Sequence, residues 1–270
     1  MNSVLYKQFE QDALQWAEEA GKILIDQEHS FTVQKNKDDV DVCTSADVEV
    51  ENLLTNKIMK KYPNHGILRE EQVPINEESE FQWIIDPLDG TKEYVRGMGE
   101  YNVLLAVEEN RNVVAGVIRR FGHPVIYSCS KGNGSYMNNT KIHVTDVSLL
   151  EKAFVASNLP AKNNTSVETI RSDMQLFAKL IQQLYRLRPG SDDAKMATLV
   201  SQGVYDAYLS FPKRQKWWDI APALLLVEEA GGKVTNWEGN PIMNHDLSKG
   251  IVASNGLLHE QLLNIIKEAV

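Results

Sequence analysis

Cysteine is scarce in this 270-residue chain, which contains only Cys43 and Cys129. Two cysteines can form neither a thiolate metal site nor a disulfide framework, and we expect a protein of the reducing cytoplasm. The chain also lacks any apolar run that approaches the roughly 20 residues needed to cross a bilayer. Its first residues contain no basic segment followed by an apolar core, so we expect no signal peptide.

Positive charge is in the minority, because 28 Lys and Arg residues stand against 37 Asp and Glu residues, for a formal net charge of −9. A surface of that sign repels the phosphates of nucleic acids and of anionic membranes, so we expect neither as a partner. It does not exclude a negatively charged small substrate, because a bound cation can reverse the local field at a site. The hydrophobic content of 43% is ordinary for a globular protein.

The most informative stretch is residues 83–95, Trp-Ile-Ile-Asp-Pro-Leu-Asp-Gly-Thr-Lys-Glu-Tyr-Val. Its apolar start predicts a buried strand, which ends where proline removes a backbone donor. Asp86 and Asp89 follow, and a divalent cation would relieve their repulsion because Mg²⁺ prefers hard oxygen ligands. The backbone amides of Gly90 and Thr91 could open a helix and hold a phosphate. Metal and phosphate side by side indicate phosphoryl chemistry.

Taken alone, this stretch is also typical of an ordinary turn, and further acidic residues change that balance. Glu70 and Glu71 follow a second short apolar pair, although paired glutamates more often lie in a solvated loop. Asp47 is expected in the first turn of a helix, where a carboxylate also complements the helix dipole. Asp219 follows Trp218 at the start of a helix-like run, where it could equally be the N-cap.

Together these residues resemble the inositol monophosphatase superfamily of Mg²⁺-dependent, lithium-sensitive phosphomonoesterases. The patterns of that family are an acidic pair, then Asp-Pro-(Ile/Leu)-Asp-Gly-Thr, then Trp-Asp-x-x-(Ala/Pro) leading to Glu-Ala-Gly-Gly. Here they stand in the family order at residues 70–71, 86–91, 218–222 and 229–232. The resemblance therefore extends over most of the chain.

The resemblance implies a set of metal ligands. Glu70, Asp86 and the backbone carbonyl of Leu88 would hold a first Mg²⁺. Asp86 would bridge to a second ion, held also by Asp89 and Asp219. A third and weaker ion near Glu70 would bring the number to three.

The resemblance also implies catalytic roles. Asp47 and Thr91 would position the attacking water, and Glu70 would join them as a catalytic residue. The amides of Gly90 and Thr91 would hold the phosphate. The implied phosphate and substrate contacts are Leu88, Asp89, Gly90, Thr91 and Asp219.

Within the superfamily, two stretches resemble the bacterial 3′(2′),5′-bisphosphate nucleotidases more than typical inositol monophosphatases. They are Gly-Thr-Lys-Glu-Tyr at residues 90–94 and Gly-Glu-Tyr at residues 99–101. Gly190, Ser191 and Lys195 resemble the Gly-Ser-x-x-Lys of that branch, with a spacing one residue longer.

A basic loop precedes the Trp-Asp motif and contains Lys213, Arg214 and Lys216. These side chains, with Lys195, could meet a second phosphate of the substrate, or the loop could simply be solvated. The leading expectation is 3′-phosphoadenosine 5′-phosphate as the small-molecule substrate. Inositol 1-phosphate, histidinol phosphate and sugar phosphates are alternatives, and an inactive regulator that binds a ligand is the alternative of another class. A homodimer is left open.

Apolar spacing predicts a long amphipathic helix over residues 5–24 and a second helix from Ser45 to the Tyr-Pro pair at residues 62–63. Residues 35–41 are expected to form a charged turn, residues 101–137 an antiparallel meander, and residues 218–229 an apolar helix. Strands and helices alternate from about residue 149, which predicts an α+β half over residues 1–148 and an α/β half over residues 149–270. The layered αβαβα sandwich of the family is implied by the resemblance.

Overall fold

The computed structural model describes residues 2–36, 42–159 and 166–269 of the chain. Two compact units make up the structure, residues 1–140 and 141–270. The division expected after residue 148 lies eight residues beyond this one. Most of the charged turn expected over residues 35–41 lies outside the described residues. None of the described helices combines the length and the apolar character that a membrane crossing requires.

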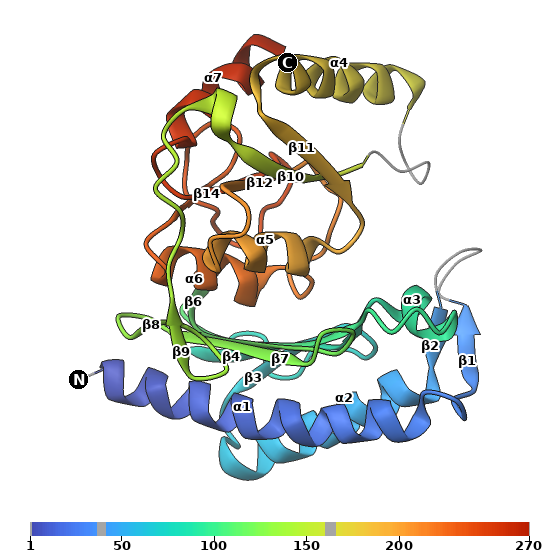
Figure 1. Ribbon diagram of the computed structural model, residues 1–270. Helices are drawn as coiled ribbons and strands as arrows, with labels where there is room; N and C mark the ends of the chain where they lie inside the picture. The colour runs from blue at the N-terminus through green and yellow to red at the C-terminus, as the bar shows by residue number, and fades with distance from the viewer. Residues whose placement is uncertain (1, 37–41, 160–165, 270) are drawn as a thin grey trace. The chain divides into compact units, whose positions relative to one another are not determined.

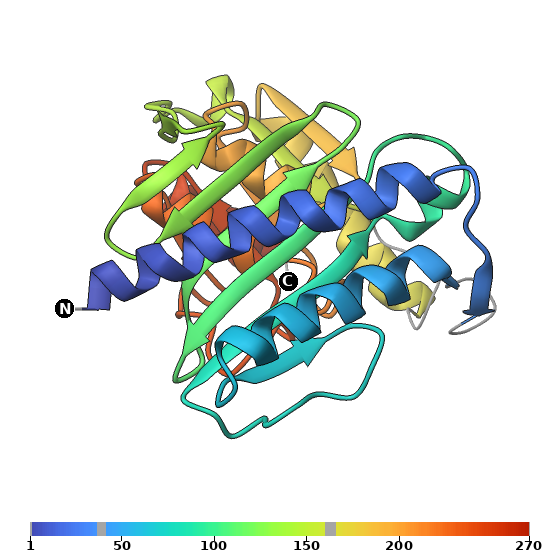
Figure 2. The same cartoon turned by 90° about the horizontal axis from the view of Figure 1, so that it is seen from below.

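The first unit is built on a seven-stranded sheet with the order β3-β4-β5-β6-β7-β8-β9 (Figure 2). Strand β3 (Gly66–Arg69) runs parallel to β4 (Phe81–Asp89). The pairs from β4 to β8 are antiparallel, which confirms the expected meander. The other strands of this sheet are β5 (Asn102–Glu109), β6 (Asn112–Arg120), β7 (Val125–Ser130), β8 (Gly134–Met137) and β9 (Thr140–Ile142).

Two long helices, α1 (Asn2–Gln27) and α2 (Ser45–Lys61), cover one face of this sheet, as Figure 2 shows. Both confirm the helices expected from apolar spacing. The indole of Trp83 on β4 is fully buried beneath them and packs against the rings of Phe9, Trp16 and Tyr62. A small antiparallel hairpin, β1 (Val33–Asn36) with β2 (Val42–Thr44), leads into α2. The charged turn was predicted to begin at residue 35, but the backbone of residues 35 and 36 belongs to β1.

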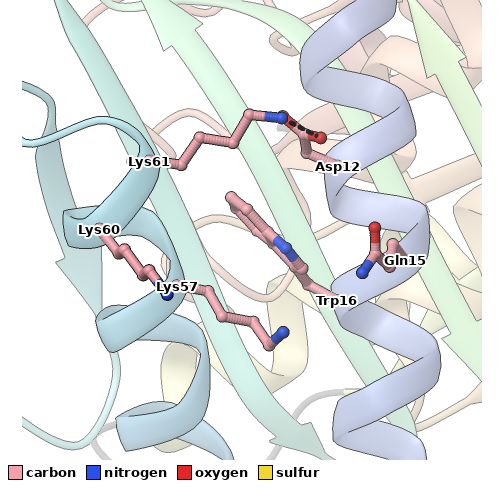
Figure 3. A pocket seen from close by; sticks show the side chains of 6 residues that line it. All are labelled: Asp12, Gln15, Trp16, Lys57, Lys60 and Lys61. Carbon is pink, nitrogen blue, oxygen red and sulfur yellow. Dashed lines mark hydrogen bonds and ion pairs between the residues drawn. The ribbon is translucent and has the colours of Figure 1, made fainter.

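A lysine-rich groove of about 410 Å³ lies between α1 and α2 (Figure 3). Its lining residues are Asp12, Gln15, Trp16, Lys57, Lys60 and Lys61. Lys61 Nζ lies 2.6 Å from Asp12 Oδ1, and Lys57 Nζ lies 2.5 Å from a carboxylate oxygen of Glu19. The groove is therefore a helix–helix seam that two ion pairs close, and it contains none of the motif residues.

We expect Asp12→Ala to destabilise this seam. Asp12 is only 7% exposed and accepts hydrogen bonds from Gln8 Nε2, Lys61 Nζ and the Tyr62 hydroxyl. Loss of the carboxylate removes the ion pair with Lys61 and the acceptor of the partly buried Tyr62 hydroxyl, so the free energy of unfolding should fall by about 1–3 kcal/mol. Urea unfolding followed by tryptophan fluorescence measures the change. Gln15→Ala, an exposed position in the same groove, is the control and should cost less than about 0.5 kcal/mol. Equal losses in the two variants would contradict this account.

The second unit is a five-stranded mixed sheet with the order β11-β10-β12-β14-β13. Strand β10 is parallel to β11 and β12, whereas β14 is antiparallel to β12 and β13. Helices α4 and α7 pack on one face and α5 and α6 on the other (Figure 1). The strands are β10 (Phe154–Asn158), β11 (Arg186–Gly190), β12 (Ala207–Ser210), β13 (Lys233–Thr235) and β14 (Ile251–Ser254). The helices are α4 (Val167–Gln183), α5 (Asp193–Ser201), α6 (Ala221–Glu229) and α7 (His259–Ala269). This arrangement confirms an α/β unit.

Three features of this unit differ from the sequence-based expectation, and the first is strand β13, which is only three residues long and was not expected. Strand β11 was not expected, because it is a largely exposed edge strand that contains a proline and two arginines and has no apolar run. Helix α6 begins at Ala221 rather than at Trp218, and the residues before it form a turn. The proline in its first turn fits that start, because a helix does not need the missing N–H there.

Candidate active site

The end of β4 is irregular where the two motif aspartates lie. Asp86 pairs with Leu104 and Asp89 pairs with Asn102, so β4 contains one residue more than β5 over this interval. Such a bulge changes the direction of side chains and is common beside active sites. Asp86 is 2% exposed, and its Oδ1 accepts a hydrogen bond from the Leu88 amide at 3.1 Å. Asp89 Oδ2 accepts one from Asn102 Nδ2 at 2.7 Å, so both carboxylates have fixed orientations.

The parallel pairing of β3 with β4 brings the acidic pair to the same edge. Arg69, the last residue of β3, is level with Ile85. Glu70 therefore leaves β3 level with Asp86, and Glu71 follows it. This register gathers the predicted ligands Glu70, Asp86 and Asp89 at one end of two neighbouring strands. Strand β3 is also the strand that the sequence predicts before Glu70.

Gly90 makes the turn from β4 into the short helix α3 (Thr91–Val95). Its φ is +89°, a left-handed conformation that glycine adopts without strain. A Cβ atom here would lie 3.0 Å from the carbonyl oxygen of Glu100, so the close approach of the two backbones also requires glycine. Helix α3 is a single short turn, and phosphate binding by the amides of Gly90 and Thr91 stays a prediction.

The structure brings Asp47 and Thr91 into direct contact, although they are far apart in the sequence. The Thr91 hydroxyl lies 3.1 Å from Asp47 Oδ1 and 2.9 Å from the Leu88 carbonyl oxygen, so its single proton is shared between two acceptors. Asp47 Oδ2 accepts from the amide and the hydroxyl of Thr44, at 2.8 and 2.5 Å. Asp47 is therefore both the partner of Thr91 and half of a capping box that begins α2.

Burial raises the pKa of Asp47 to about 6. The hydrogen bonds from Thr44 and Thr91 oppose that rise, whereas the charge of Glu71 adds to it. Glu51, one turn further along α2, is fully buried, and burial raises its pKa to about 7. Its Oε2 accepts a hydrogen bond from the Glu71 amide at 2.8 Å. The negative charge of Glu71 thus contributes to the rise at both Asp47 and Glu51, and that of Glu70 to the rise at Glu51.

Sequence reasoning missed Thr44, Glu51 and Asn102 in this site. Thr44 had a local signal, because a threonine three residues before an acidic residue is typical of a capping box. Glu51 stands four residues after Asp47, so a helix places both on one face. Asn102 had no local signal, since its contact with Asp89 depends on the register across the bulge.

The donor set fits a hard divalent cation, because every candidate ligand is a carboxylate or carbonyl oxygen. Burial is the main cause of the raised pKa values of Asp47 and Glu51, and the negative charge of Glu71 adds to both. Within residues 2–36, 42–159 and 166–269, no group of three or more His, Cys, Asp or Glu side chains is arranged as a metal cage. Mg²⁺ does not require one, since it usually keeps several waters and binds one or two carboxylates. The predicted ligand set stays a prediction.

The second unit contains Asp219, which lies two residues before α6. The expected N-cap role for Asp219 is wrong, because Ile220 occupies that position without a side-chain cap. Asp219 Oδ2 instead accepts from the Lys216 amide at 2.7 Å and closes the preceding turn. A pocket of about 410 Å³ surrounds this turn. It is lined by Lys213, Arg214, Gln215, Lys216, Trp217, Asp219, His245, Leu247 and Ser248.

The basic residues expected to meet a second phosphate are not equivalent. Lys213 and Lys216 are exposed and line the pocket beside Asp219. Arg214 lines it too, but its Nη2 donates to Asp173 on α4 at 2.7 Å, in an ion pair whose side chains are 11% and 10% exposed. Lys195 lies in the first turn of α5, where its backbone amide donates to the side chain of Asp192, the N-cap of that helix. Lys195 does not belong to the pocket lining.

A family model described as "Inositol monophosphatase family" matches residues 6–270. The inositol-1-monophosphatase of Bacillus subtilis (strain 168) is 29% identical over 97% of this chain and 99% of its own. The fructose-1,6-bisphosphatase/inositol-1-monophosphatase of Thermotoga maritima is 30% identical over 88% of this chain and 87% of its own. The crystal structure of the extragenic suppressor protein suhB from Bartonella henselae matches with a TM-score of 0.86 and 26% identity, over 96% of this chain and 98% of that one. The expected layered fold class is confirmed.

We expect Gly90→Ala to destabilise the protein more than Gly97→Ala. Both glycines have positive φ, +89° and +66°, but only a Cβ at Gly90 meets another backbone. Gly97→Ala should therefore cost about 1–2 kcal/mol, the ordinary penalty of the left-handed region, and Gly90→Ala at least about 1 kcal/mol more. Chemical unfolding of both variants measures the difference. Equal losses would show that the approach of the Glu100 carbonyl does not constrain this turn.

Proposed function

The chain belongs to the inositol monophosphatase family, whose members are phosphatases, and we propose that it hydrolyses a small phosphate monoester with Mg²⁺ as its cofactor. The contact of Thr91 with Asp47, beside Asp86 and Asp89 at the end of β4, carries the proposal. It supplies a hydroxyl and a carboxylate next to an all-oxygen acidic edge. The family is generally metal-dependent, which supports the cofactor.

The proposed division of roles follows from the donors and acceptors of each side chain. Glu70, Asp86, the Leu88 carbonyl, Asp89 and Asp219 would hold two or three Mg²⁺ ions. When bound, Mg²⁺ stabilises the negative charge that develops on the phosphoryl oxygens during transfer.

Thr91 and Asp47 would hold the attacking water. When the Thr91 hydroxyl donates its hydrogen bond to Asp47 Oδ1, the lone pairs of the Thr91 oxygen remain free to accept a hydrogen bond from that water. The capping hydrogen bonds from Thr44 hold Asp47 in place for this contact. The water oxygen would then be oriented for in-line attack on phosphorus.

We propose inositol 1-phosphate as the first substrate, ahead of 3′-phosphoadenosine 5′-phosphate. Two relatives, from Bacillus and Thermotoga, are named as inositol-1-monophosphatases, which supports this choice. Arg214 already forms an ion pair with Asp173, which makes it less available to bind a second phosphate of the substrate.

A bisphosphate is the second candidate, because Lys213 and Lys216 line the pocket beside Asp219. The Thermotoga relative is also named as a fructose-1,6-bisphosphatase, so a sugar bisphosphate belongs to this class with the bisphosphate nucleotide.

We expect Asp86→Asn and Asp219→Asn each to lower kcat/KM by about a thousandfold or more, which corresponds to roughly 4 kcal/mol of transition-state stabilisation. Phosphate release with Mg²⁺ measures the effect, and circular dichroism checks that the variants stay folded. Asp26→Asn, an exposed carboxylate on α1, is the control and should act as wild type. Excess EDTA should abolish turnover and Li⁺ should inhibit it. Wild-type turnover in either site variant, or no phosphate release from any small ester by the wild type, would favour the inactive regulator instead.

The substrate is tested by kcat/KM for four esters: inositol 1-phosphate, 3′-phosphoadenosine 5′-phosphate, fructose 1,6-bisphosphate and histidinol phosphate. We expect the wild type to prefer inositol 1-phosphate, and Lys213→Ala/Lys216→Ala to leave that value within about threefold. A lost charge-assisted phosphate contact costs roughly 1.5–3 kcal/mol, or about ten- to a hundredfold. A wild-type preference for a bisphosphate, together with a loss of that size on the bisphosphate alone, would establish the second candidate.

A further inference from the structure

One face of α2 carries three buried polar residues, Asp47, Glu51 and Thr55. Their spacing of four residues places them in a row along the helix. They are 0%, 0% and 7% exposed. Figure 2 shows α2 lying along the sheet, and α2 contacts β4 directly. The first of the three is the partner of Thr91, so the row begins at the candidate active site.

The other two residues of this row hold the segment that carries the acidic pair. Glu51 Oε2 accepts from the Glu71 amide at 2.8 Å. Thr55 Oγ1 accepts from Arg69 Nη1 at 3.2 Å, and Arg69 Nε donates to the Val73 carbonyl at 2.9 Å. The chain from residue 69 to residue 73 is therefore closed on itself by Arg69 and fastened to α2 at two points.

Glu51 is an unusual choice for a purely structural contact. It is fully buried, its Oε1 makes no hydrogen bond within the described chain, and Arg69 Nε lies 3.9 Å from that oxygen. A buried carboxylate with so few partners is costly. The cost is accounted for if the contact with the Glu71 amide serves the site at the end of β3.

We propose that Glu51 is a positioning residue that sets the metal affinity of the site by fixing the backbone at Glu71, and with it the carboxylate of Glu70. This inference rests on the proposed function, because it assumes that Glu70 binds the metal. Glu51 acts through the hydrogen bond to the Glu71 amide and touches neither substrate nor metal. Because Asp47 lies on the same helix, one rigid element then positions both the residue that contacts Thr91 and the acidic pair.

The test is the affinity for Mn²⁺ alone, measured by isothermal titration of the full chain without substrate. Glu51→Gln keeps an acceptor at the same reach, so its dissociation constant should stay within about threefold of wild type. Glu51→Asp keeps the charge but is one methylene shorter, and it should weaken binding as much as Glu51→Ala. Changes to residues that orient metal ligands typically cost about ten- to a hundredfold in affinity, which is the loss expected for both.

Asn52→Ala is the matched control, because Asn52 Oδ1 accepts from Gln72 Nε2 at 3.0 Å and so makes an exposed contact from the same helix to the same segment. It should leave Mn²⁺ binding unchanged. Wild-type affinity in Glu51→Ala would overturn the proposal. So would a pattern in which Glu51→Asp binds normally and Glu51→Gln does not, since charge rather than the hydrogen bond would then matter.

If the Glu51 variants fail to fold, amide hydrogen exchange of the wild type decides. The Glu71 amide should exchange at least about tenfold more slowly than the Gln72 amide, because only the former is bonded to a buried acceptor. Equal rates would overturn the proposal. If the wild type itself binds no Mn²⁺, the proposed function fails; if it binds and the Glu51 variants bind equally well, only this inference fails.

Discussion

The burial of several carboxylates near one end of β3 and β4 is the constraint on which the local structure of the first unit depends. Removing a carboxylate from water is unfavourable, and burial is the main reason that the pKa values of Asp47 and Glu51 rise to about 6 and about 7, with the charge of Glu71 adding to both. Four acidic side chains of this site accept hydrogen bonds from uncharged donors. Backbone amides serve Asp86 and Glu51, a side-chain amide serves Asp89, and threonine hydroxyls serve Asp47.

This arrangement explains why the surrounding elements are irregular where they meet the site. The bulge in β4 redirects two aspartates, and the left-handed Gly90 lets the chain turn against the Glu100 carbonyl. The capping box of α2 uses Asp47, so a residue that caps the start of the helix also contacts Thr91. A stabilising local feature and a functional contact are combined in one side chain. Elsewhere in the unit, α1 and α2 pack over Trp83.

Much of the fold could be predicted from the sequence, because the relevant signals are local. Apolar periodicity found α1 and α2, alternation found the meander, and the motif at residues 86–91 located the end of β4. The failures have non-local causes. Strand β11 is recognisable only through its pairing with β10, and α6 starts late because the Asp219 carboxylate closes a turn ahead of it. The ion pair of Arg214 with Asp173 joins residues 41 apart, which no local pattern indicates.

The central claim is that the carboxylates at the end of β4 bind a divalent cation for phosphoryl transfer. The most direct measurement is an anomalous difference map from crystals grown with Mn²⁺ and inorganic phosphate. The account predicts a strong anomalous peak between the carboxylates of Glu70 and Asp86, with phosphate beside Gly90 and Thr91. An occupied Mn²⁺ site elsewhere and none at this edge, in crystals that diffract well enough to show it, would contradict the account.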